Sequence, residues 1–114
     1  IYPEIFQLLR QLRREYKTGL LSNLTPEMRD HVRARHELDK FFDTQVYSCD
    51  SDIAAMKPDN KPYLAVAQKL GVSPENCLFI DNSVKNVEAA QSVGMQAIFF
   101  KTLSRFLEEI KFLL

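Results

Sequence analysis

Apolar residues recur at helical spacing in several segments of the chain. Near its start, Ile5, Leu8 and Leu12 lie on one face at i, i+3 and i+7, which predicts a helix over residues 2–16. The Thr-Pro-Glu sequence at 25–27 has a capping residue, a first-turn proline and an acid at the positive end of a helix. Together these patterns predict helices over residues 2–16, 25–36, 62–70, 83–93 and 103–114, and a short element over residues 38–42.

Short apolar runs lie between these helices and predict strands over residues 17–22, 45–49, 77–81 and 96–100. The run over 77–81 is continuous in apolar residues, so we expect that strand to be buried on both faces. Alternating strands and helices imply a parallel sheet, because parallel neighbours need a crossover connection. We therefore predict an α/β fold, a three-layer Rossmann-like parallel sheet of about four strands flanked by helices.

Polar residues follow three of the predicted strands. Ser22 and Asn23 come after the first, Lys57 lies in the loop after the second, and Asp81 and Asn82 come after the third. In parallel α/β sheets, ligands bind beyond the carboxyl ends of the strands. We therefore expect a hydroxyl, an ammonium and a carboxylate group to converge at one edge of the sheet.

These groups suit a bound phosphoryl group. The Ser22 hydroxyl and neighbouring backbone N–H groups would give directed hydrogen bonds, and Lys57 would neutralise charge on the phosphoryl oxygens. Asp81 and the amide of Asn82 offer the oxygen ligands that Mg²⁺ prefers. Each residue also has an ordinary structural interpretation as a turn residue, a solvated lysine or a helix cap, so only their conjunction favours a functional site.

Three segments resemble motifs of the haloacid dehalogenase-like (HAD) hydrolase superfamily. They are residues 19–23 (Gly-Leu-Leu-Ser-Asn), 57–59 (Lys-Pro-Asp) and 78–83 (Leu-Phe-Ile-Asp-Asn-Ser), in the order and spacing of that family's second, third and fourth motifs. The resemblance covers nearly the whole chain. It is greatest to the branch with a helical cap inserted after the first motif, which includes dehalogenases and phosphoglycolate-phosphatase-like enzymes.

The resemblance implies a Mg²⁺-dependent phosphatase or dehalogenase that acts on a small phosphorylated metabolite or a haloacid. Ser22 would bind the phosphoryl oxygen and Asn23 would line the same pocket. Lys57 would be a catalytic residue that also binds phosphate and stabilises the nucleophile and the transition state. Asp81, with Asn82 beside it, would hold Mg²⁺.

The chain departs from the family pattern in two ways. The first motif, a strand ending in Asp-x-Asp that supplies the nucleophile, has no match; the only candidate by spacing, Asp50-Ser-Asp52, follows the second strand. We therefore expect residues 1–114 to form a single partial core domain, the carboxyl-terminal part, without first motif or cap and inactive by itself. Asn82 stands where a second acid is usual, so we expect Mg²⁺ binding to be weak or absent.

The composition fits one ordinary globular domain. Of the 114 residues, 46% are hydrophobic, and 15 Lys and Arg balance 15 Asp and Glu. A balanced charge offers no basic surface for nucleic acid or an anionic membrane. The two cysteines have no metal-type spacing, which favours a reduced, cytoplasmic protein. We expect Arg10, Arg13 and Arg14 to form a solvated helix face, with an anion site as the alternative.

Other functions and assemblies stay open at this point. A non-catalytic HAD-like domain that binds a protein partner or an anion is the main alternative. A phospho-receiver domain is disfavoured, because its acceptor aspartate would precede the hydroxyl and the lysine. We predict that strands 17–22 and 77–81 pair directly in one parallel sheet, with a homodimer that covers their edges as the alternative.

Overall fold

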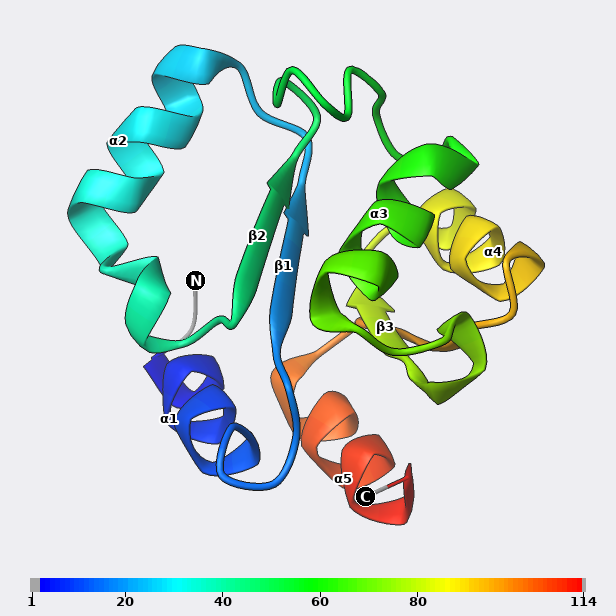
Figure 1. The fold of residues 1–114 in the computed structure, drawn as a ribbon. Helices are drawn as coiled ribbons and strands as arrows, with labels where there is room; N and C mark the ends of the chain where they lie inside the picture. Colours follow the sequence, from blue (N-terminus) through cyan, green and yellow to red (C-terminus); the bar gives the residue numbers. More distant parts are fainter. Residues whose placement is uncertain (1–2, 114) are drawn as a thin grey trace.

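The computed structural model describes residues 3–113, in which strands and helices alternate as predicted (Figure 1). The predicted helix at the start of the chain ends early, at Leu12, and residues 2 and 114 of the predicted terminal helices lie outside the described residues. The elements are α1 (Pro3–Leu12), β1 (Gly19–Ser22), α2 (Pro26–His36), β2 (Thr44–Tyr47), α3 (Asn60–Leu70), β3 (Leu78–Asp81), α4 (Val84–Ser92), β4 (Gln96–Phe99) and α5 (Leu103–Leu113), with 3₁₀ turns at Leu38–Lys40 and Pro74–Asn76.

The predicted helix ends have the expected chemistry. The Thr25 hydroxyl accepts a 3.2 Å hydrogen bond from the Met28 N–H at the start of α2. Gly71 ends α3 in the left-handed conformation, with φ of 74°, where a side chain would be strained. No helix in residues 3–113 is long and apolar enough to span a membrane.

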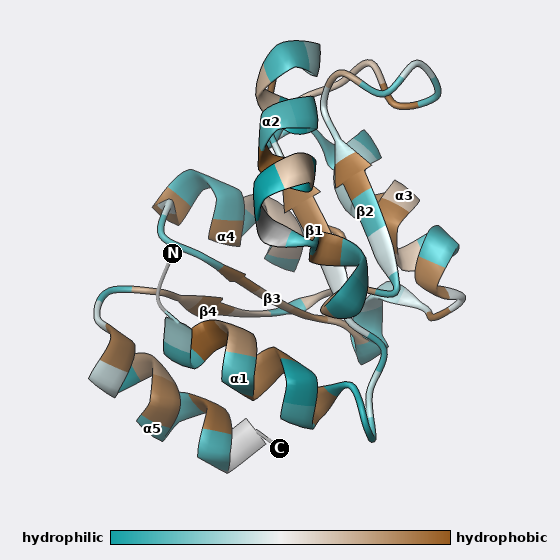
Figure 2. Cartoon of the chain, turned by 90° about the vertical axis from the view of Figure 1, so that its left-hand side faces the viewer, coloured by the Kyte–Doolittle hydropathy of each residue, from teal (hydrophilic) through white to brown (hydrophobic). Residues whose placement is uncertain are grey.

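The strands form two separate parallel ladders. β1 pairs with β2, so that Leu20 lies opposite Gln45, and β3 pairs with β4, so that Phe79 lies opposite Ala97. No ladder joins β1 to β3 among the described residues, and the predicted direct pairing of these strands is wrong. In Figure 2 the two pairs run in different directions. The α/β class with parallel strands and flanking helices is confirmed.

A shared apolar core joins the two ladders. Val46 of β2, Tyr63 and Val66 of α3, and Ala90 of α4 are all buried in one cluster. Phe79 and Ala97, from the second ladder, pack against the same cluster. Side chains of α3 and α4 therefore hold together two ladders that share no backbone hydrogen bonds.

A second core lies on the other face of β3 and β4. Ile98, Phe106 and Ile110 are buried there, and Ile5 and Leu8 of α1 pack against them. In Figure 2, α1 and α5 lie on one side of the β3–β4 pair and α4 lies on the other. The helices on both faces give the predicted three layers around this pair.

Strand β3 is less buried than its apolar sequence predicts. Ile80 is 38% exposed, and Phe99, one residue further along the neighbouring strand, is 39% exposed. Burial of β3 on both faces is therefore a wrong prediction for this chain. The reason is that β3 has a hydrogen-bonded neighbour on one side only, which leaves its other edge uncovered.

Candidate functional site

The centre of the candidate site is an ion pair between the two ladders. Lys57 lies in the loop after β2, and its Nζ contacts Asp81 Oδ2, at the end of β3, at 2.8 Å. The two side chains are only 12% and 9% exposed. The predicted convergence of Lys57 and Asp81 at the carboxyl ends of the strands is therefore present in the structure. A partly buried pair of this kind is screened much less by salt than a surface pair.

Asn23 fixes the backbone that carries Lys57. Its Oδ1 accepts a 2.9 Å hydrogen bond from the Lys57 N–H, and its Nδ2 donates a 3.2 Å hydrogen bond to the Lys57 carbonyl oxygen. The carboxamide thus ties the end of β1 to the lysine loop. Because both of its polar atoms are used in this way, the predicted contact of the Asn23 side chain with substrate stays a prediction.

Asp81 accepts hydrogen bonds on both of its oxygens. Oδ1 accepts from the Ser83 N–H at 3.0 Å, and Oδ2 accepts from Asn86 Nδ2 at 3.2 Å as well as from Lys57. Three nitrogen donors therefore surround this carboxylate. Their hydrogen bonds hold it in one orientation.

Two further residues that carry no predicted role support this arrangement. The Tyr63 hydroxyl donates a 3.0 Å hydrogen bond to the carbonyl oxygen of Asn86, whose amide contacts Asp81. Burial raises the pKa of Tyr63 to about 12, with a smaller contribution from the charge of Asp81. A sequence signal exists for Asn86, because it lies three residues after the helix cap Ser83 and so faces back towards the strand end.

Ser22 and Asn82 differ in their surroundings. Ser22 is half-buried, and its backbone carbonyl accepts from the Ser48 N–H at 3.0 Å. Its hydroxyl makes no hydrogen bond within the described part of the chain, so it is available to a ligand. Asn82 is exposed and precedes Ser83, which caps α4. The roles predicted for these two residues stay predictions.

The carboxylates of the described residues do not fit a Mg²⁺ ion at this site. Mg²⁺ needs near-octahedral oxygen ligands, commonly one or two carboxylates together with substrate phosphates and water. Asp81 is the one acid in the Lys57 network, and both of its oxygens already accept from nitrogen donors. Among the side chains that the structure describes, no group of three or more His, Cys, Asp or Glu residues could hold a metal ion.

The Asp-x-Asp sequence at 50–52 has structural partners elsewhere. Asp50 pairs with Arg29 at 3.2 Å and accepts from the Tyr47 N–H at 2.9 Å. Asp52 is exposed and pairs with Lys69 of α3 at 3.1 Å. Neither carboxylate takes part in the Lys57–Asp81 network. This agrees with the position of the Asp-x-Asp sequence, which follows the second strand.

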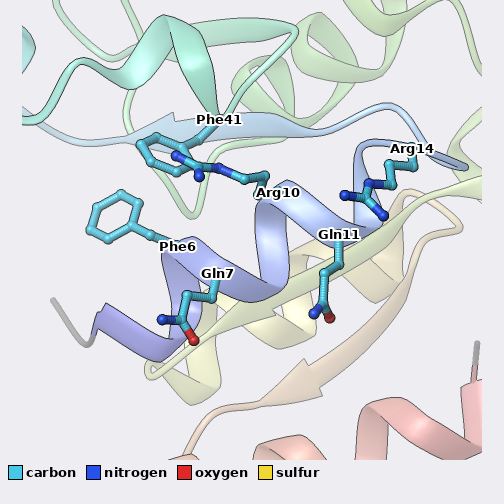
Figure 3. Close-up of a pocket in the computed structure, with 6 residues that line it drawn as sticks. All are labelled: Phe6, Gln7, Arg10, Gln11, Arg14 and Phe41. Atoms are coloured by element: carbon cyan, nitrogen blue, oxygen red, sulfur yellow. The ribbon is translucent and has the colours of Figure 1, made fainter.

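A separate pocket lies on the outer face of α1 (Figure 3). It has a volume of about 480 Å³, and its lining residues are Phe6, Gln7, Arg10, Gln11, Arg14 and Phe41. Phe41 precedes β2, so this pocket is at the end of the strand opposite to the Lys57 loop. The guanidinium of Arg10 lies 5.7 Å from the centre of the Phe41 ring.

Arg13 does not belong to the solvated face predicted for the arginines of this helix. Its side chain is only 33% exposed, and it pairs with Asp43 at 3.1 Å. It also donates a 3.1 Å hydrogen bond to the carbonyl oxygen of Asp39. Arg13 therefore fastens the end of α1 to the segment before β2.

Comparison with known proteins agrees with the motif pattern. Residues 1–94 match a family model described as haloacid dehalogenase-like hydrolase. A curated relative, Phosphatase MT3486 of Mycobacterium tuberculosis, is 37% identical over 101 residues, which are 84% of this chain and 44% of the relative. The phosphorylated carbohydrates phosphatase of Thermotoga maritima is 35% identical over 80 residues, 69% of this chain and 36% of the relative. The chain thus spans less than half the length of these relatives.

Solved structures show the same fold. A HAD-like family hydrolase from Porphyromonas gingivalis matches with a TM-score of 0.84 and 30% identity, over 99% of this chain and 57% of that chain. A HAD family enzyme from Bacteroides thetaiotaomicron, solved with magnesium and inorganic phosphate, matches with a TM-score of 0.78 and 23% identity. That alignment covers 93% of this chain and 58% of the other.

Proposed function

Because the chain belongs to the haloacid dehalogenase-like hydrolase family, we propose that it supplies the phosphate-binding part of a phosphatase for a small phosphorylated metabolite. The observation that carries this proposal is the Lys57–Asp81 pair at the carboxyl ends of the strands. The names of the relatives favour a phosphate ester over a haloacid, since both of the curated relatives described above are phosphatases.

Each residue of the site has a distinct role in this proposal. The Ser22 hydroxyl donates to one phosphoryl oxygen, and the Lys57 ammonium, which is paired with Asp81, donates a charge-assisted hydrogen bond to another. Asp81 holds the ammonium of Lys57 in position, and Asn23 holds the backbone of the same residue. The phosphoryl group therefore meets a Lys57 ammonium whose position is already fixed, which reduces the entropy lost on binding.

The described chain binds and stabilises but does not itself supply a nucleophile. A covalent phosphoryl intermediate would need a second carboxylate beside Lys57. Within residues 3–113, the carboxylate in hydrogen-bond contact with Lys57 is that of Asp81, and three nitrogen donors surround it. We therefore propose that residues 1–114 alone bind phosphate without hydrolysing its esters.

An NMR titration of the 114-residue protein with inorganic phosphate tests the binding site. We expect the amides of Ser22 and Asn23 to shift at concentrations on the order of tens of millimolar, as weak single-anion binding implies. The variant Lys57→Met should lose the response. Lys69→Met is the matched control, because Lys69 pairs with the exposed Asp52 and should leave it unchanged. Unshifted amides at Ser22 and Asn23 would contradict the proposal.

A further inference from the structure

We infer that Asp81 is the fixed partner of Lys57 and not a magnesium ligand, so that this chain binds phosphate without a divalent cation. The inference rests on the proposed phosphate site and concerns how that site balances its charge. Its basis is the set of donors around the Asp81 carboxylate.

The first argument is the occupation of the carboxylate oxygens. Oδ2 accepts from Lys57 Nζ and from Asn86 Nδ2, and Oδ1 accepts from the Ser83 N–H. A carboxylate offers about four lone-pair positions, and three of them are used here. A cation at Asp81 would have to displace one of these donors or bind through the single lone-pair position that remains.

The second argument is electrostatic. The Lys57 ammonium, 2.8 Å from Asp81, already neutralises the one negative charge of the pair. A divalent cation placed beside this carboxylate would be repelled by the ammonium. It would also have to share the single negative charge of Asp81 with Lys57. Asn86, whose side chain contacts Asp81, is a neutral amide and adds no negative charge.

The third argument is the direction in which Asn86 faces Asp81. An ionised carboxylate can only accept, so the amide must present its NH₂ group to Asp81. The backbone of Asn86 is held in turn by the Tyr63 hydroxyl at 3.0 Å and by the Ser83 hydroxyl, which accepts from its N–H at 3.4 Å. Asn86 is therefore a positioning residue that holds an N–H donor against the Asp81 carboxylate.

The test compares phosphate binding with millimolar Mg²⁺ and with EDTA, on the 114-residue protein. We expect the dissociation constant for phosphate to agree within about twofold in the two conditions. We also expect Mg²⁺ alone to leave the amide signals of Asp81 and Ser83 in place. A tenfold or larger gain in phosphate affinity with Mg²⁺, or saturable shifts at Asp81 with Mg²⁺ alone, would overturn the inference.

A pair of variants sharpens the comparison. Asn86→Asp puts a second carboxylate against Asp81, and two adjacent carboxylates attract a divalent cation. This variant should show Mg²⁺-dependent shifts at Asp81 and Ser83 that the parent lacks. Asn76→Asp, in the exposed turn before β3, adds the same charge elsewhere and should show none. Equal responses in the parent and in Asn86→Asp would contradict the assigned role of Asn86.

The result also separates this inference from the proposed function. If phosphate fails to bind under either condition, the proposed function is wrong. The Mg²⁺ titration of the unliganded parent then still decides whether Asp81 is a metal ligand. If phosphate binds only with Mg²⁺, the proposed function stands and the inference falls.

Discussion

The Tyr63 hydroxyl donates a 3.0 Å hydrogen bond to the carbonyl oxygen of Asn86, and the two residues belong to different helices. Tyr63 is fully buried in α3, with its ring 5.1 Å from that of Phe79 of β3, centre to centre. Since Asn86 also contacts Asp81, a single side chain of the core supports both the junction between α3 and α4 and the orientation of the candidate site.

Replacing Tyr63 by Phe should lower the free energy of unfolding by about 1–2 kcal/mol, because the partly buried hydrogen bond to the Asn86 carbonyl is lost while the ring stays in place. Urea denaturation measures this change. Tyr16→Phe is the matched control, since Tyr16 is 44% exposed, and this variant should unfold at the same urea concentration as the parent. Equal stability of the Tyr63→Phe variant and the parent would show that the hydrogen bond makes no net contribution to the free energy of unfolding.

Tyr63 also predicts how stability depends on alkaline pH. Its pKa in the folded protein is about 12, above the ordinary value of 10.0, because burial disfavours the phenolate. The folded state therefore keeps a proton that the unfolded state loses, so its contribution is fully present below pH ~10 and is lost as the pH rises towards ~12. Burial also raises the pKa of Tyr47, so the difference between the parent and Tyr63→Phe isolates Tyr63. A pH-independent difference between pH ~9 and ~12 would contradict this account.

The coupling between Lys57 and Asp81 can be measured with a double-mutant cycle of Lys57→Met and Asp81→Asn. Each single variant should be destabilised by roughly 2–4 kcal/mol, because each leaves a mostly buried polar group without its partner. The double variant should lose less than the sum of the two, with a coupling energy of about 1–3 kcal/mol. The exposed pair of Lys69 and Asp52 provides the control, and its coupling should stay below about 1 kcal/mol. Additive losses at Lys57 and Asp81 would argue against a specific pair.

Glu37→Gly should stabilise the protein. Glu37 follows α2 with φ of 48°, in the left-handed region where glycine carries no steric cost. Relief of this cost is worth about 1 kcal/mol, partly offset by the greater freedom of glycine in the unfolded chain. The lost contact with Lys40 joins two exposed side chains, so little stability is lost with it. A lowered melting temperature would contradict the prediction.

Residues 1–114 should not turn over a generic aryl phosphate, with or without Mg²⁺. Binding and electrostatic stabilisation remain, but the covalent step has no nucleophile among the described residues of the site. The measurement is release of the aryl alcohol over hours by purified protein. Steady turnover that survives purification and disappears in Asp81→Ala would refute the prediction.

Local chemistry made much of the fold predictable. Thr25 and Gly71 limit helices through their own side-chain and backbone properties, which depend little on the rest of the chain. The positions of Lys57 and Asp81 were predictable for a related reason. Parallel strands place their carboxyl ends at one edge, so residues that follow the strands come together whichever strands are neighbours.

The pairing of the ladders was not predictable in the same way. The apolar sequence of β3 fits burial on both faces, but the exposure of Ile80 depends on which strand lies beside it, a contact far away in the sequence. The ion pair of Arg13 with Asp43 likewise spans 30 residues. Helical periodicity places an arginine on a face of its helix but does not say which segment covers that face.

The candidate site lies at the junction between the two ladders. Ser22, Asn23 and the Lys57 loop belong to the first ladder, whereas Asp81 belongs to the second. Among the described residues, side-chain packing and polar side-chain contacts join the two halves, without a shared strand. A local opening at this junction would part Lys57 from Asp81 while each ladder keeps its own hydrogen bonds. Amide exchange along the junction should therefore be faster than exchange within either ladder.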